Sequence, residues 1–267
     1  MTPYGGLVIV RGGGDLATGI IYRLWRCGFR VLSLEVSAPL AVRRTVSAAS
    51  AVFDGECVID GMPVKRISSA DGFSGVQGVS VIVDPEGDSI ARLRPDIVID
   101  AVMAKRNTGT NINMAPMVIG IGPGFTAKVD VHYVVETKRG HYLGRLLSEG
   151  GAIPNTGIPG MEMGYTTERL LRAPAEGYME QFAEIGDHVT AGAVVGRIGG
   201  ADVCAQIDGI LRGLIHPSVY VTEGMKIGDV DPRNIREHCF SITDKALAIA
   251  GGVLEAVLRN NAESKSF

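Results

Sequence analysis

The sequence lacks the marks of several protein classes. No apolar run approaches the roughly 20 residues that a membrane-spanning helix needs. The first residues show no basic segment followed by an apolar stretch and a cleavage site, so no secretory signal is visible. The net charge is only −3, which argues against binding nucleic acid through bulk electrostatics. We therefore expect a cytoplasmic protein that binds neither membrane nor nucleic acid.

Cysteine is scarce, and its four copies lie far apart. There is no C-x-x-C pair and no histidine at zinc-site spacing near Cys27, Cys57, Cys204 or Cys239. This pattern predicts reduced, mostly structural thiols and no metal site.

The familiar catalytic signatures are also missing. The chain has no G-x-S-x-G elbow, no H-E-x-x-H motif and no P-loop lysine. No group of residues indicates a particular reaction, so the sequence leaves open whether the protein is an enzyme. The modest candidates for an acid, base or nucleophile are His141 and Lys105.

Glycine, in contrast, is abundant and marks a specific turn. An apolar run, residues 7–10, stops at Arg11, three glycines follow, and a helical pattern begins at Asp15. Gly12, Gly14 and Ala17 fit the spacing G-x-G-x-x-G/A of the dinucleotide fold. Gly12 would permit the tight turn, and Gly14 would let a pyrophosphate approach the backbone beside the free N–H groups of the helix. The turn therefore predicts a nucleotide-binding site.

Glu35 ends the next apolar run, residues 30–35, and lies 21 residues after Gly14. The dinucleotide fold places a ribose-binding carboxylate about 20 residues beyond the glycine motif. An ordinary polar residue at a strand end would also explain Glu35, but its combination with the turn favours the ribose role. Because a carboxylate repels a 2′-phosphate, a nicotinamide ligand would be NAD rather than NADP.

Residues 39–51 predict a second helix that carries Arg43 and Arg44. These cations could form a solvated helix face or contact phosphate at the mouth of the crevice. Residues 52–67 alternate around two Asp-Gly turns and predict short antiparallel strands.

Four further apolar runs predict strands that are covered on both faces, at residues 79–84, 96–102, 117–121 and 131–136. Ligands of open parallel sheets bind outside the carboxyl ends of the strands. Each polar residue at that edge could belong to a solvated loop, but together they indicate an anionic small-molecule site. They are Glu35, Asp84, Asp100, Lys105, Arg106, Asn107, Thr108, Glu136, Arg139 and His141.

From residue 173 the pattern changes to short alternating runs between glycine turns, which predicts a small all-β unit. The unit contains an internal repeat, because residues 173–177 return as residues 205–209 at an offset of 32. The same offset pairs Val189 with Val221, Thr190 with Thr222 and Gly192 with Gly224. Two such halves resemble the barrel-sandwich hybrid of biotinyl and lipoyl domains.

That resemblance implies a carrier lysine on the hairpin between the halves, and residues 199–204 contain none. We therefore expect no biotin or lipoate, and a docking or dimerisation role for the unit. Cys204 is interpreted as a buried small hydrophobe. The chain closes with a predicted helix at residues 243–258, which Ser241 or Thr243 would cap. Its Gly251-Gly252 pair would weaken it unless the pair marks a close contact.

In sum the sequence predicts an α/β fold with three parts. A Rossmann-like, mostly parallel sheet forms a nucleotide-binding domain at residues 1–165. A barrel-sandwich hybrid domain without a carrier lysine follows at residues 166–236, and residues 237–267 form the C-terminal helix and tail. The predicted cofactor-binding residues are Gly12, Gly13, Gly14, Asp15, Ala17, Glu35, Arg43, Arg44, Lys105, Arg106, Asn107, Gly122, Gly124 and Arg139.

Several motifs along the chain also resemble one family. They are residues 11–19, 41–45, 104–109, 122–126, 136–141, 172–174 and 226–233. As a set they resemble the YqeB-type accessory proteins of the selenium-dependent molybdenum hydroxylase system. One departure is Lys128, where a small residue would be expected.

The resemblance implies a role in maturing hydroxylases whose molybdenum cofactor carries labile selenium, with no defined chemistry. Three hypotheses stay open. The first is a maturation factor that binds a nucleotide, either NAD or molybdopterin cytosine dinucleotide, and docks a molybdenum hydroxylase or another maturation protein. The second is an NAD-dependent oxidoreductase or transferase acting on a small anionic substrate, and the third is a non-catalytic scaffold. A homo-oligomer is compatible with each.

Overall fold

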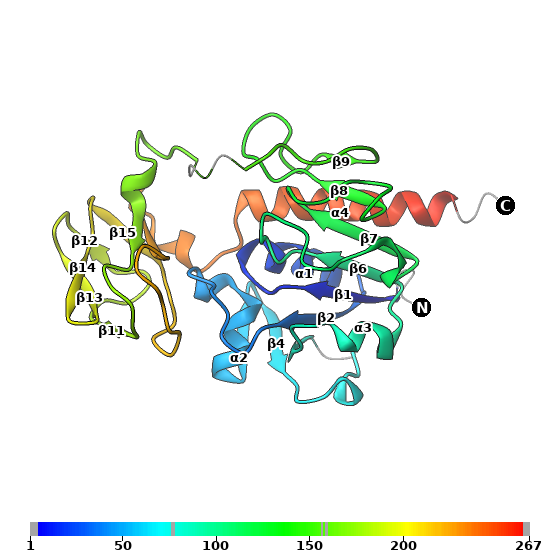
Figure 1. Cartoon of the computed structure of the whole chain (residues 1–267), viewed down its shortest axis with the longest axis horizontal. Coiled ribbons are helices and arrows are strands. Elements are labelled where there is room, and N and C mark those ends of the chain that lie inside the picture. The colour runs from blue at the N-terminus through cyan, green and yellow to red at the C-terminus, as the bar shows by residue number, and fades with distance from the viewer. Residues whose placement is uncertain (1–4, 76–77, 156, 158–159, 264–267) are drawn as a thin grey trace.

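A nine-stranded sheet forms the larger part of the molecule (Figure 1). The computed structural model describes residues 5–75, 78–155, 157 and 160–263. The strand order is β3-β4-β5-β2-β1-β6-β7-β8-β9. All pairings from β4 to β8 are parallel, and the two edge pairings, β3 with β4 and β8 with β9, are antiparallel. The strands are β1 (Leu7–Arg11), β2 (Arg30–Glu35), β3 (Glu56–Ile59), β4 (Met62–Arg66), β5 (Val79–Val83), β6 (Ile97–Asp100), β7 (Met117–Ile121), β8 (Tyr133–Val135) and β9 (Leu146–Leu147).

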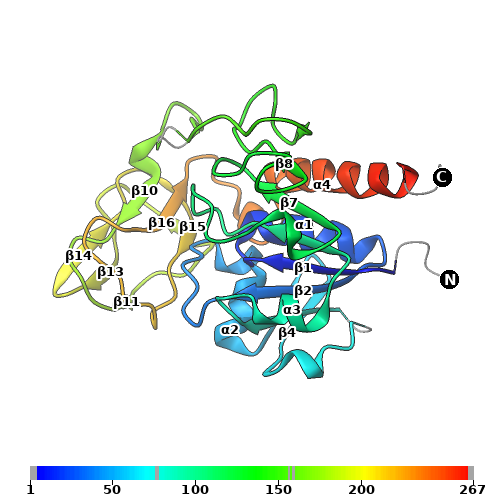
Figure 2. The ribbon, with the colours of Figure 1, turned by 45° about the vertical axis from the view of Figure 1, so that its right-hand side comes forward.

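Two helices, α1 (Asp15–Arg26) and α4 (Asp244–Glu263), cover one face of this sheet (Figure 2). Their apolar stripes pack on alternate strand residues such as Val8 and Ile99. The intervening residues, such as Ile9 and Val98, face a second core that contains Ile90 of the short helix α3 (Asp88–Leu93). The helix predicted after residue 243 is confirmed, and the Oγ1 of Thr243 caps it by accepting the N–H of Ala246 at 3.1 Å. Residues 264–267 of the predicted tail lie outside the described residues.

The predicted Rossmann-like fold class is wrong. A doubly wound sheet needs a helix in each crossover, on both faces. Here the described crossovers from β6 to β7 and from β7 to β8 contain no α-helix, and both edges of the sheet are antiparallel. Irregular loops, at residues 101–111 and 122–132, stand in place of the missing helices. The fold is a mixed nine-stranded sheet with few helices, joined to two antiparallel sheets.

The helix predicted at residues 39–51 is also wrong. The segment forms two 3₁₀ turns, Arg44–Val46 and Ala48–Ser50, followed by the short helix α2 (Ala51–Asp54). The hydroxyls of Ser47 and Ser50 donate to the carbonyls of Arg43 and Arg44 at 2.8 and 2.6 Å. Such local bonds compete with a regular helix.

The remaining strands form two antiparallel sheets, which we call the β-unit (residues 170–231), in place of the predicted barrel-sandwich hybrid. One sheet has the order β10-β16-β15-β12 and the other β11-β13-β14. Their strands are β10 (Leu170–Arg172), β11 (Met179–Gln181), β12 (His188–Val189), β13 (Val194–Ile198), β14 (Ala201–Cys204), β15 (Gly209–Leu214) and β16 (Lys226–Asp231). The further 3₁₀ turns are Ala70–Gly72, Ile112–Met114, Thr167–Arg169 and Arg236–Cys239.

The internal repeat has a structural counterpart within the β-unit. Gly192 donates its N–H to Ala205 at 2.8 Å, and Gly224, 32 residues later, donates to Ala173 at the same distance. Val189 pairs with Gly209, and Val221 pairs with Gly177. Each half therefore bonds to the other in the same way, which confirms the repeat.

None of the described helices combines the length and the apolar character that a membrane span requires.

Candidate functional site

The two outer glycines of the turn between β1 and α1 serve different physical purposes. Gly12 has a φ of +93°, and a Cβ there would lie 2.9 Å from the carbonyl oxygen of Ala101. Gly14 has a φ of −64° and a ψ of 178°, which any residue adopts. A Cβ on Gly14 would meet no atom within 4 Å, because this position opens toward a cavity. Backbone geometry thus requires glycine at residue 12, whereas glycine at residue 14 leaves space free.

Glu35, at the end of β2, stabilises the turn through a hydrogen bond to its backbone. Its Oε1 accepts the N–H of Gly13 at 2.6 Å, and its Oε2 accepts the N–H of Val36 at 3.0 Å. Burial raises the pKa of Glu35 above its ordinary value, and the two N–H bonds oppose that shift. Each carboxylate oxygen keeps accepting capacity for a further donor.

These residues line a cavity of about 630 Å³, which we call the glycine-turn cavity. Its volume lies within the range of small-molecule sites. The hydrogen-bonding side chains on its wall are mostly acidic, with one arginine. The lining residues are Arg11, Gly12, Gly14, Asp15, Leu16, Ala17, Leu34, Glu35, Val36, Leu40, Ala41, Asp84, Pro85, Glu86, Ala101, Val102, Met103 and Thr108.

Most of these charges already have protein partners. Arg11 forms a buried ion pair with Asp100 at 3.2 Å, and both contact the Oγ1 of Thr110. Burial raises the pKa of Asp84, but N–H groups from Gly87 to Ser89 outweigh it, so the pKa is lowered. The wall therefore offers acceptors of hydrogen bonds, such as Glu35, more readily than free cations.

A second cavity, of about 280 Å³, collects the cations, and we call it the cationic cavity. Met103 lines both cavities, so they adjoin. Among the described residues on its wall there are four cations and no carboxylate. The lining residues are Met103, Lys105, Pro123, Thr137, Lys138, Arg139, Ile153, Pro154, Asn155, Gly160 and Lys245.

Separate segments bring these cations together. Lys105 follows β6 with a φ of +63°, Lys138 and Arg139 follow β8, and Lys245 lies in the first turn of α4. Arg139 pairs with Asp244 at 3.0 Å, and its other terminal nitrogen lies 3.9 Å from Glu162. Burial, followed by the charge of Arg139, lowers the pKa of Lys245.

The predicted site residues fall into three groups. Gly12, Gly14, Asp15, Ala17 and Glu35 line the glycine-turn cavity, and Gly13 donates its N–H to Glu35. Lys105 and Arg139 line the cationic cavity. The remaining predicted residues, which line neither cavity, are Arg43, Arg44, Arg106, Asn107, Gly122, Gly124 and His141.

Several residues of the third group contact neighbouring loops or side chains. The side chain of Asn107 bonds to the backbone of Gly109 and Thr110 within its own loop. A Cβ on Gly124 would lie 2.8 Å from the Cα of Arg106, so this glycine lets two loops approach. His141 is exposed and stacks edge-on against Tyr142.

Arg43 and Arg44 connect the nine-stranded sheet to the β-unit. Arg44 donates to the carbonyl of Leu214 at 2.7 Å. Arg43 reaches Asp15 and the carbonyl of His238, both at 3.2 Å. Neither arginine lines the glycine-turn cavity, although Arg43 contacts Asp15 on its wall.

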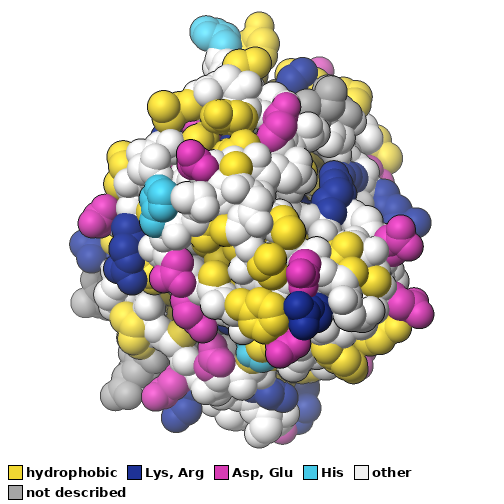
Figure 3. Space-filling view, turned by 90° about the vertical axis from the view of Figure 1, so that its left-hand side faces the viewer, with side chains coloured by type: hydrophobic (Ala, Val, Ile, Leu, Met, Phe, Trp, Pro, Cys, Tyr) yellow, Lys and Arg dark blue, Asp and Glu magenta, His cyan; other side chains and the backbone are white. Residues whose placement is uncertain are grey.

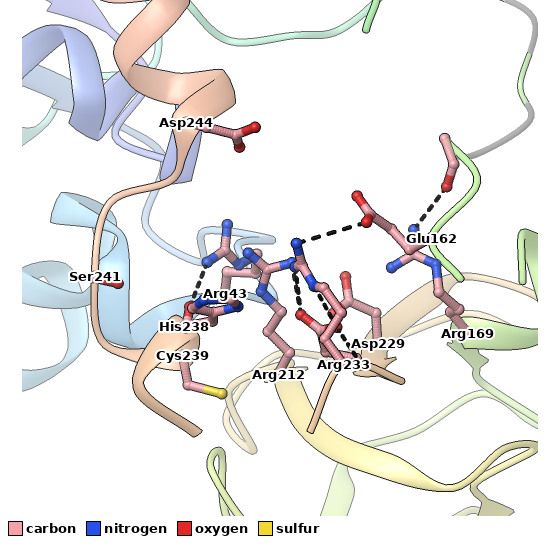
Figure 4. A network of polar contacts seen from close by, with 12 residues as sticks. Arg43, Glu162, Arg169, Arg212, Asp229, Arg233, His238, Cys239, Ser241 and Asp244 are labelled. Atoms are coloured by element: carbon pink, nitrogen blue, oxygen red, sulfur yellow. Dashed lines mark hydrogen bonds and ion pairs between the residues drawn. The ribbon is translucent and has the colours of Figure 1, made fainter. Parts of the chain in front are cut away.

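Figure 4 shows the network around Arg43, in which Arg212 and Arg233 lie beside carboxylates of the β-unit. Asp231 accepts from Arg212 at 3.1 Å and from Arg233 at 2.6 Å. Arg233 also lies 3.6 Å from Glu162, which itself contacts Arg139. A chain of ion pairs therefore links the β-unit to the cationic cavity.

Sequence reasoning missed Met103, Lys138 and Lys245 as site residues. Lys138 belongs to the polar loop that contains Arg139, and that loop was the available signal. Nothing local marks Lys245, because it lies about a hundred residues further along the chain.

Cys204 is exposed, so its interpretation as a buried hydrophobe is wrong. Within the described residues, no three His, Cys, Asp or Glu side chains are grouped to hold a metal ion.

Comparison with solved structures gives only weak likenesses. A succinylglutamate desuccinylase/aspartoacylase from Rhodobacter sphaeroides matches with a TM-score of 0.27 and 15% identity, over 85% of each chain. An aspartoacylase family protein from Mesorhizobium loti matches with a TM-score of 0.27 and 12% identity, also over 85% of each chain. TM-scores this low carry no argument about fold or activity.

No protein-family model matches the chain. Over 255 residues it is 46% identical to the uncharacterized protein YqeB of Escherichia coli K12. The match covers 94% of this chain but 47% of that relative, so the chain spans about half of the relative's length. The relative's name assigns no activity, ligand or role. The resemblance to YqeB-type proteins is thus supported over nearly all of this chain.

Proposed function

We propose that this chain binds a nucleotide-containing small molecule in the glycine-turn cavity. One observation carries the proposal: the open space at Gly14 adjoins both the N-terminus of the 12-residue helix α1 and the carboxylate of Glu35. Unpaired N–H groups in the first turn of a helix favour a phosphate. The remaining acceptor capacity of Glu35 suits the hydroxyls of a ribose.

The resemblance to YqeB-type accessory proteins supplies the role in this proposal. The bound molecule is the molybdopterin cytosine dinucleotide cofactor, or NAD, and the protein serves the maturation of selenium-dependent molybdenum hydroxylases. His141 is exposed and lines neither cavity, so it gives no specific support to the alternative of an NAD-dependent oxidoreductase.

The test is calorimetric titration with NAD, FAD, CDP and molybdopterin cytosine dinucleotide. We expect at least one of them to bind the wild type and to lose affinity about tenfold or more in Gly14→Val, whose side chain fills the open space. The matched control is Gly72→Val. A Cβ on Gly72 also meets no atom within 4 Å, and its 3₁₀ turn, Ala70–Gly72, contributes no residue to the cavity lining. Absence of binding to all four by the folded wild type would overturn the proposal.

We further propose that the β-unit docks the partner protein. Its support is a group of exposed aromatic side chains, in which Tyr178 and Tyr220 stack edge-on at 5.3 Å and Phe182 is 49% exposed. Figure 3 shows hydrophobic side chains on this end of the molecule among charges of both signs. Aromatic residues with a polar rim are typical of protein interfaces.

The double variant Tyr178→Ser with Tyr220→Ser tests this part. We expect weaker association with the hydroxylase and unchanged nucleotide affinity. Unchanged association with a purified hydroxylase would contradict the docking role.

A further inference from the structure

The cationic cavity carries more positive charge than its protein partners neutralise. Lys105, Lys138 and Lys245 form no ion pair with any described residue, whereas Arg139 pairs with Asp244 and Glu162. Gathering like charges in one cavity costs free energy unless a counter-charge is present. Burial is the main cause that lowers the pKa of Lys245, and the charge of Arg139 adds to it, whereas the carboxylates of Asp15, Glu136 and Asp244 oppose the shift.

We propose that the cationic cavity is a binding site for a multiply charged phosphate group. The four cations come from three separate loops and helices, and their side chains line one space of about 280 Å³. That space exceeds the volume of a single phosphate and accommodates a pyrophosphate or a small phosphate ester.

The chemistry of the wall fits a phosphate better than a single carboxylate. Lysine ammonium groups bind phosphate oxygens as point charges, and the guanidinium of Arg139 adds directed donors. Three lysines that form no direct ion pair with a described residue call for more than one negative charge. Met103, Pro123 and Ile153 supply the apolar part of the wall.

The site does not depend on nucleotide binding in the glycine-turn cavity. Among the described residues, the two linings share only Met103, and the cationic cavity uses no residue of the glycine turn. Either cavity could therefore bind its ligand if the other did not.

A ligand in the cationic cavity would also affect the ion pairs of the β-unit. A phosphate that contacts Arg139 competes with Glu162, which pairs at the same time with Arg233. Binding is thus expected to weaken the ion-pair chain that ends at Asp231.

The experiment is calorimetric titration of the full chain with inorganic pyrophosphate at low ionic strength. We expect binding by the wild type and about tenfold or greater loss of affinity in Lys105→Met and in Lys245→Met. Methionine keeps the length of the side chain and removes the charge. Lys65→Met is the matched control, because Lys65 is exposed on β4 at the opposite side of the sheet. Lys138→Met, at an exposed position, supplies a second test if Lys245→Met fails to fold.

The outcomes separate this site from the proposed function. No pyrophosphate binding by the wild type overturns the inference, and so does an equal loss of affinity in Lys65→Met, which would indicate nonspecific attraction. Gly14→Val is expected to retain pyrophosphate binding. If nucleotides bind and pyrophosphate does not, the cationic site is refuted and the nucleotide proposal stands. If pyrophosphate binds and no nucleotide does, the nucleotide proposal is refuted and the cationic site stands.

Discussion

At the scale of single residues, the glycine turn shows why residue type must be read together with geometry. Gly12, Gly13 and Gly14 are adjacent, yet backbone strain requires only the first of them to be glycine. The sequence predicted distinct purposes for Gly12 and Gly14 from spacing alone, and their φ angles agree with that distinction. The hydrogen bond from Gly13 to Glu35 could not be predicted, because it depends on how β1 and β2 lie side by side.

Gly12→Ala and Gly14→Ala are expected to differ in stability. The first places a side chain at a φ of +93° and against the carbonyl of Ala101, so it should lower the free energy of unfolding by about 1–3 kcal/mol. The second should change it by less than about 0.5 kcal/mol, because its Cβ meets open space. Urea denaturation measures both values. Equal effects of the two substitutions would contradict the turn geometry.

Glu35→Gln should alter how stability depends on pH. Because burial raises the pKa of Glu35 in the folded state, its contribution is fully present below the unfolded pKa of about 4.3 and is lost as the pH rises through the folded pKa. The free energy of unfolding of the wild type minus that of the variant should therefore decrease as the pH rises from 4 to 7. Chemical denaturation at both pH values gives this difference. A difference that rises with pH would show that the folded pKa is lowered instead.

At the scale of elements, periodicity located β1, α1, β2, β7 and α4 to within a few residues. It failed at residues 39–51, where serine hydroxyls bond to local carbonyls and no helical stripe can form. Some glycines inside helices mark close contacts with other segments, and the hydrophobic pattern of the sequence does not show which segments these are. A Cβ on Gly19 of α1 would lie 2.6 Å from the Cβ of Ala246 in α4. Gly252 of α4 meets the backbone of Gly144, so the glycine pair does mark a close contact, with a loop.

Gly19→Val tests the packing of α1 on α4. Overpacking at this contact should lower the free energy of unfolding by about 1–3 kcal/mol. Gly251→Ala is the matched control within α4, since its Cβ meets no atom within 4 Å and alanine favours a helix by up to about 1 kcal/mol. Thermal unfolding should show opposite shifts in Tm for the two variants. A stabilising Gly19→Val would refute the close contact.

Asp231→Asn tests the network that joins β16 to its neighbours. Burial raises the pKa of Asp231, but the hydrogen bonds and charge of Arg233 and the charge of Arg212 outweigh it, so the pKa is lowered. Removing this buried charge should cost about 3 kcal/mol near neutral pH. Because the folded pKa is lowered, the contribution is present above the unfolded pKa and is lost as the pH falls through the folded pKa.

Its control is Asp202→Asn, whose partner Arg197 is 46% exposed and whose ion pair should contribute less than about 1 kcal/mol. Denaturation at pH 7 and pH 3 compares the two variants. An equal cost for both at pH 7 would contradict the importance of burial at Asp231.

At the scale of the whole molecule, the local strand–turn–helix was predictable and the fold class was not. The glycine motif describes one crossover, whereas a Rossmann-like sheet requires helices in all of them. The connections after β6 and β7 contain no α-helix, which the motif at the N-terminus does not reveal. The internal repeat was visible because identical turns recur at one offset. For the cationic cavity, the sequence predicted Lys105 and Arg139 but not Lys245. Lys245 lines the cavity because α4 packs on the sheet, and a sequence pattern does not show that packing.

The most direct measurement is a crystal structure of the chain with the nucleotide that binds most tightly in calorimetry, at a saturating concentration. Our account predicts electron density for its phosphate beside Gly14 and the N-terminus of α1, with a ribose hydroxyl within hydrogen-bonding distance of Glu35. Density for the ligand at another place on the molecule, with the glycine-turn cavity empty, would contradict it.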